Sequence, residues 1–228
     1  MQIGDRGHTR FSRGAILLST CLGVALASLA SAAQRTPAEA ASEECRVLLT
    51  MDVYNQAIAR CEEAVRLDPK LPDPYYMLGA AHDLLWQQET RASATPDDSR
   101  IQEHRRKAAE NYKKFLGLDR GDTEPRRRAR LTALSSLLGL YIISGGEKDE
   151  AFLEYANELA KAPSLDTRDL LILAAVYSRH ERLDLSAAFL KRDLEANPSD
   201  AHSWPTITEP LGIDRLAMIG PKLRAVLR

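Results

Sequence analysis

Histidine, cysteine and carboxylate side chains are the groups in this chain that could bind a metal or take part in catalysis. Beyond residue 32 the histidines are His82, His104, His180 and His202, and no two of them are four residues apart, as zinc ligands on one helix face would be. No Cys-x-x-Cys pair, glycine-rich phosphate loop or Gly-x-Ser-x-Gly sequence is present. We therefore expect no metal site, no cofactor and no catalytic residue, and interpret His82 as packed between helices.

The composition is that of a globular protein with little net charge. The 228 residues include 31 Lys and Arg against 32 Asp and Glu, and 44% are hydrophobic. These values argue against a wholly disordered or fibrous chain. A net charge of −1 lacks the long-range field that non-specific nucleic-acid binding needs, so we expect no nucleic-acid partner.

Two basic runs, 105–107 and 126–130, could nevertheless bind an anionic partner. Acidic residues stand close to both runs, and pairs of opposite charge three or four residues apart are common on solvated helix faces. We favour local pairing over partner binding, with these acids as the partners: Glu110, Asp119 and Glu124.

The N-terminal segment has the three parts of a secretory signal. Three arginines precede an uncharged stretch over 14–33, and Ala30-Ser31-Ala32 offers a cleavage site. We expect a signal peptide over 1–32, export to the bacterial periplasm and a disordered linker over 33–42. Two alternatives stay open: a membrane anchor formed by 14–33, and lipid attachment at Cys21. After cleavage we expect no membrane insertion.

From Glu43 onward the hydrophobic period is that of helices, and a spacing recurs within it. A small residue stands 12 positions before a proline in three places, and before Arg120 in a fourth. The four pairs are Ala57 and Pro69, Ala108 and Arg120, Ala151 and Pro163, and Ser186 and Pro198. Small residues let two helices approach closely, and proline ends the second helix.

Upstream of three of these copies stand Leu78-Gly79, Leu138-Gly139 and Leu173-Ala174. With them the pattern resembles the tetratricopeptide repeat (TPR), in which Leu-Gly precedes Ala, an aromatic residue and Pro. The resemblance implies an all-α fold, an α-solenoid of about four TPR-like helical hairpins over 43–199 with a C-terminal cap over 200–228. The second copy departs from it, because 30 residues separate Leu78 from Ala108 where 13 are expected.

Proteins with this repeat bind peptides or helices along the concave face made by the first helix of each hairpin. The resemblance therefore implies a non-catalytic adaptor of the cell envelope with a protein or peptide partner. The groove residues expected from the alignment are Asp73, Tyr76, Ala80, Asp83, Ser136, Leu140, Ile143, Arg168, Leu171 and Ala175.

Two other functions remain open under the same alignment. An envelope hydrolase or lyase would need two carboxylates that share a proton, and Asp73 with Asp83 is the candidate pair. A self-assembling structural protein would associate through the long second hairpin or the first one. The alignment also places Cys45 and Cys61 on the two helices of the first hairpin, either as a disulfide or as two buried thiols.

Overall fold

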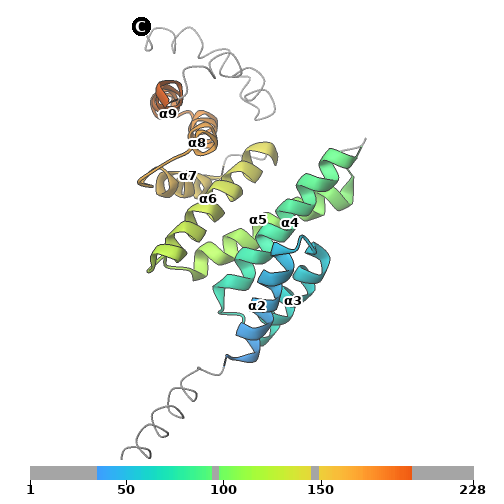
Figure 1. The fold of residues 1–228 in the computed structure, drawn as a ribbon. Coiled ribbons are helices and arrows are strands. Elements are labelled where there is room, and N and C mark those ends of the chain that lie inside the picture. Colours follow the sequence, from blue (N-terminus) through green and yellow to red (C-terminus); the bar gives the residue numbers. More distant parts are fainter. Residues whose placement is uncertain (1–34, 94–97, 145–148, 197–228) are drawn as a thin grey trace, which may run out of the picture. The chain divides into compact units, whose positions relative to one another are not determined.

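The computed structural model describes residues 35–93, 98–144 and 149–196, and within them the protein is all-α (Figure 1). The chain divides into two units, Met1–Thr36 and Pro37–Arg228, and the description below concerns the second. The predicted signal peptide, Cys21 and the predicted C-terminal cap lie outside the described residues. Eight helices and no strand occupy the described ranges: α2 (Pro37–Thr50), α3 (Tyr54–Leu67), α4 (Pro72–Ala92), α5 (Ser99–Leu118), α6 (Glu124–Ser144), α7 (Glu150–Leu159), α8 (Thr167–Arg179) and α9 (Leu183–Ala196).

The first described helix, α2, begins within the predicted linker. The prediction of a disordered segment over 33–42 is wrong from Pro37 onward, where the chain is helical. Proline suits the first turn because its missing N–H would have no partner there. The buried residues of this helix are all small: Ala38, Ala41, Ser42 and Cys45. Near its end, Leu48 and Leu49 pack against the cluster around the cysteines.

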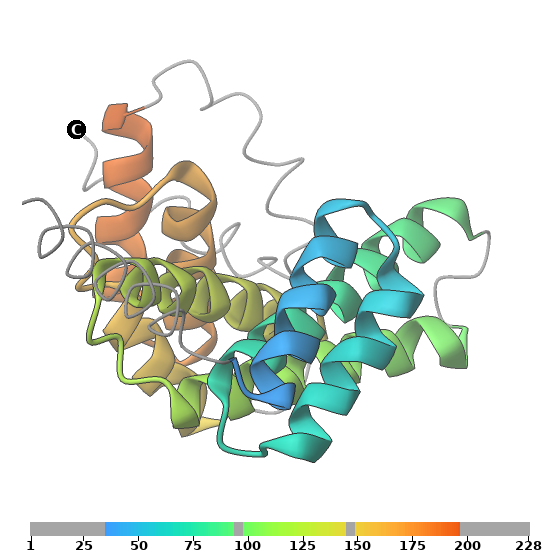
Figure 2. The ribbon, with the colours of Figure 1, turned by 60° about the horizontal axis from the view of Figure 1, so that its bottom comes forward.

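Each even-numbered helix packs against the odd-numbered helix that follows it, and the even-numbered helices also contact one another in succession. Figure 1 shows α4 and α5 side by side, and Figure 2 shows the same pair from another direction. These two are long because α4 continues to Ala92 and α5 starts already at Ser99. Within the described ranges, none of the helices is both long and apolar enough to cross a membrane.

Aspartate side chains cap the N-termini of three of the described helices. Asp98 accepts a hydrogen bond from the Arg100 amide at 2.8 Å, and Asp166 accepts one from the Asp169 amide at 2.8 Å. Asp149 does the same at the start of α7. Such caps satisfy amides that have no partner within the helix, which explains where these helices start.

The core consists of two clusters with Tyr76 packed against both. One surrounds Cys45 and Cys61 between α2, α3 and α4, and the larger one extends from α5 to α9. Tyr76 contacts Phe115 with ring centroids 5.3 Å apart. The aromatic rings of α4 and α5 therefore join the two clusters.

Candidate functional site

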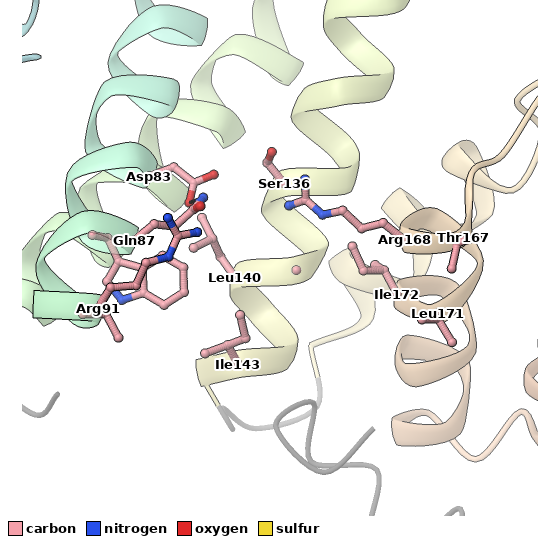
Figure 3. Close-up of a pocket in the computed structure, with 13 residues that line it drawn as sticks. Asp83, Gln87, Arg91, Ser136, Leu140, Ile143, Thr167, Arg168, Leu171 and Ile172 are labelled. Atoms are coloured by element: carbon pink, nitrogen blue, oxygen red, sulfur yellow. Dashed lines mark hydrogen bonds between the residues drawn. The ribbon is translucent and has the colours of Figure 1, made fainter. Parts of the chain in front are cut away.

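The candidate site is a groove of about 690 Å³ lined by three even-numbered helices, α4, α6 and α8 (Figure 3). We call it the groove throughout. Its lining residues are Asp83, Trp86, Gln87, Thr90, Arg91, Ser136, Gly139, Leu140, Ile143, Thr167, Arg168, Leu171 and Ile172.

The lining follows from helical periodicity. The α4 residues recur at intervals of three and four from Asp83 to Arg91, and the α6 residues do so from Ser136 to Ile143. Residues at these intervals share one face of a helix. Figure 3 shows α6 between the other two helices, with Leu140 and Ile143 directed into the space that α4 and α8 border.

One end of the groove is polar and contains a buried carboxylate. Asp83 accepts a hydrogen bond from the Gln87 side-chain amide at 3.0 Å. Burial raises the pKa of the Asp83 carboxyl above its ordinary value, while the Gln87 hydrogen bond and the Arg168 charge act in the opposite direction. The rest of the lining is mainly apolar, and Ile143 is 41% exposed within it.

Six of the ten residues predicted for the groove line it: Asp83, Ser136, Leu140, Ile143, Arg168 and Leu171. The other four lie outside its lining. Tyr76 packs against both core clusters, and Ala175 of α8 is buried in the larger one. Ala80 is half-buried on α4, and Asp73 forms an ion pair with Arg126.

The structure adds residues that sequence reasoning missed, chiefly those on the last two turns of α4. Trp86, Gln87, Thr90 and Arg91 continue the same face beyond Asp83. The sequence does indicate these residues, because the spacing of three and four positions continues beyond Asp83 to Arg91. The groove residues were assigned at the aligned repeat positions alone, and on this helix the last of these positions is Asp83.

Asp73 and Asp83 do not form a pair that could share a proton. They are ten residues apart on one helix, which corresponds to about 15 Å of rise. Asp73 lies 3.0 Å from the Arg126 guanidinium and its side chain is half exposed, whereas Asp83 is buried. The geometry that the enzymatic alternative requires is therefore not formed by these two carboxylates.

The two cysteines of the first helix pair are joined. A disulfide links Cys45 of α2 to Cys61 of α3, with Cα atoms 5.3 Å apart. Both residues are fully buried, next to Ala57, Met77 and Leu78. Of the two interpretations that the sequence left open, the structure has the disulfide.

His82 and His104 meet between α4 and α5, as expected for a packed histidine. Their Nδ1 atoms are 2.9 Å apart, so one ring donates a hydrogen bond to the other. Burial lowers the pKa of His82 to about 4, and the charges of His104 and Lys107 add to this effect. Among the described residues, no group of three metal-ligating side chains is close enough to hold an ion.

Both basic runs form the ion pairs with nearby acids that were expected from the sequence. Arg106 binds Glu110, and Arg127 and Arg128 both bind Glu124. Arg126 bridges two acids, at 3.0 Å from Asp73 and 3.1 Å from Asp119.

Arg130, at the end of the second basic run, joins three segments of the chain. Its guanidinium binds Glu158 of α7. It also donates to the Leu116 and Asp119 carbonyl oxygens at 2.7 and 2.6 Å, where α5 ends. These contacts satisfy carbonyls that have no partner within the helix.

No protein-family model matches the sequence, and no curated protein is significantly similar to it.

Proposed function

We propose that the protein is a non-catalytic adaptor that binds a peptide or an amphipathic helix of another protein in the groove. The observation that carries this proposal is an apolar groove lined by three helices with Ile143 41% exposed in it. A surface of this kind suits an apolar stripe with residues three and four positions apart.

We further propose that the fold is a TPR-like α-solenoid of four hairpins, α2–α3, α4–α5, α6–α7 and α8–α9. The succession of contacts between even-numbered helices supports it, since a solenoid stacks the first helix of each hairpin on the next. The close approach at Gly79, where an added Cβ would lie 2.7 Å from Tyr112, supports it as well. Gly139 differs, because its nearest neighbour is Ile172 of α8 rather than a residue of α7.

Export to the periplasm is the third part of the proposal. Two observations support it. Residues 1–32 have a basic start, an apolar middle and small residues at the end, and Cys45 and Cys61 form a disulfide. Disulfides persist in oxidising compartments and are rare in the cytosol.

The adaptor function can be tested with peptides selected on the full chain from a random displayed library. We expect Ile143→Glu to weaken the binding of the selected peptides at least tenfold, because it places a charge on the apolar floor. Isothermal titration calorimetry measures the affinities, and circular dichroism checks that the variant stays folded.

Leu183→Glu is the matched control, since Leu183 is also 41% exposed but lies outside the groove lining. It should leave the affinities unchanged. Equal affinities of Ile143→Glu and the parent chain would place binding elsewhere on the molecule and contradict the proposal.

A further inference from the structure

Two arginines from opposite walls border the groove, and neither makes an ion pair with another described residue. Arg91 lies in the last turn of α4, and Arg168 lies at the start of α8. Both side chains are exposed. This is unlike the basic run at the start of α6, where Arg126, Arg127 and Arg128 all have acidic partners.

The guanidinium of Arg168 extends across the groove toward α6. A Cβ added at Gly139 would lie 3.8 Å from Arg168 Nη2, and Figure 3 shows the side chain directed from α8 toward Ser136. The absence of a side chain at Gly139 leaves this space open. The positive charge therefore lies over the groove floor.

Among the described residues of the lining, Asp83 is the one with an acidic side chain, and it does not neutralise both arginines. Its carboxylate is buried and accepts a hydrogen bond from Gln87. This bond uses one of the oxygen atoms that could otherwise bind an arginine. With Asp83 ionised, two positive charges and one negative charge give the described lining residues a net charge of about +1. An occupant with negative charge would complement it.

The shape of the groove favours a helix over a small molecule. Asp83 and Arg91 on the α4 wall are eight positions apart, a rise of about 12 Å, which matches roughly two turns of a bound helix. Exposed Ile143 and the two exposed arginines leave one side open to solvent. An amphipathic helix covers such a groove with its apolar face and keeps its polar face in water, whereas a lone acyl chain would stay partly hydrated.

We propose that the groove selects an acidic amphipathic helix of a partner protein. Its apolar side chains would lie on Leu140, Ile143 and Leu171, and carboxylates beside this stripe would pair with Arg91 and Arg168. The proposal rests on the proposed adaptor function and adds the charge of the partner to it.

The test uses three synthetic helical peptides of about 15 residues with one shared leucine stripe. Next to the stripe, the first carries Glu, the second Gln and the third Lys. Isothermal titration calorimetry with the full chain measures each affinity at low and high salt. Dodecanoate is titrated as a fourth probe, because it is an anionic amphiphile with no peptide backbone.

We expect the Glu peptide to bind most tightly, the Lys peptide least tightly, and the difference to shrink at high salt. In the double variant Arg91→Gln, Arg168→Gln, the Glu peptide should lose about tenfold in affinity while the Gln peptide changes little. Arg66→Gln is the matched control, since Arg66 is exposed on α3 and absent from the groove lining.

The outcomes separate the two proposals. If all three peptides bind equally and Ile143→Glu weakens each of them, the groove is a binding site but the charge selection is wrong. If none binds, or if Ile143→Glu has no effect on them, the adaptor proposal fails as well. Arginine-dependent binding of dodecanoate without binding of any peptide would overturn the helical partner in favour of an anionic amphiphile.

Discussion

Gly79 lies where α4 passes closest to α5. A Cβ at this position would be 2.7 and 2.8 Å from two ring atoms of Tyr112, which is itself buried. The ring cannot move away without disturbing Tyr76, whose centroid is 6.3 Å from its own. The absence of a side chain at Gly79 therefore sets how closely the two helices approach.

We expect Gly79→Ala to lower the free energy of unfolding by about 1–3 kcal/mol, because the added methyl group overpacks the contact. Gly117→Ala is the matched control on α5, since nothing lies within 4 Å of its added Cβ. It should raise the free energy of unfolding by up to about 1 kcal/mol, because alanine favours the helix. Urea denaturation measures both, and a stabilising Gly79→Ala would contradict the close approach.

His82 makes stability depend on pH. Its pKa in the folded protein is about 4, and its side chain is buried with 3% exposed surface. The unfolded chain takes up the proton near pH 6.5 and the folded chain does so only near pH 4. The stability from neutral His82 is therefore complete above about pH 6.5 and is lost as the pH falls toward 4.

We expect this loss to reach about 3 kcal/mol between pH 7 and pH 4, from urea denaturation at a series of pH values. The other groups facing His82 are His104, Lys107 and Glu103, all on α5. His82→Gln keeps a hydrogen-bonding side chain opposite His104 and should give a flatter pH profile. An equally steep profile in this variant would assign the pH dependence to other groups.

At the scale of elements, α2 and α3 combine a disulfide with a small core. The cluster around Cys45 and Cys61 holds five buried residues, whereas the cluster from α5 to α9 is several times larger. The disulfide closes a loop of about 15 residues, which corresponds to roughly 3 kcal/mol in the chain-entropy estimate. The first helix pair should therefore be the part of the described fold that reduction affects most.

Reduction of the folded chain should increase amide hydrogen exchange in α2 and α3 and leave α6 and α8 little changed. Mass spectrometry of peptic fragments measures the exchange, and the variant Cys45→Ala, Cys61→Ala should respond as the reduced chain does. Thiol titration of the unreduced chain under denaturant should find neither cysteine reactive. Two reactive thiols from these positions would contradict the disulfide.

At the scale of the whole molecule, the sequence predicted the all-α class and the helices that line the groove. The class follows from the hydrophobic period, which identifies the residues that share a face of a helix. The helices that line the groove are those that the resemblance to the TPR implied. The hydrophobic period does not show which face of a helix packs against the neighbouring helices. Tyr76 was therefore assigned to the groove although it packs in the core. The start of α2 was missed for a related reason, since the buried residues of its first two turns are alanine and serine, which show no apolar period.

The last two turns of α4 were left out of the predicted groove because its residues were taken from the aligned repeat positions, the last of which on this helix is Asp83. Trp86 and Arg91 lie on those turns, and both line the groove. Ion pairs within one helix were predicted better than the groove residues, because Arg127 and Arg128 pair with Glu124 about one turn away. Arg130 and Glu158 are 28 positions apart and lie on two different helices, so no local spacing in the sequence indicates their ion pair.

The bridge from Arg126 to Asp73 and Asp119 has a mechanical consequence. It fastens α6 to the first turn of α4, and the groove begins ten residues further along each helix, at Ser136 and Asp83. Each helix is thus a lever about 15 Å long with its fulcrum at the bridge. Widening the angle between them by about 4° separates the groove walls by about 1 Å, so a small change at the bridge alters the width of the groove at residues that the bridge does not touch.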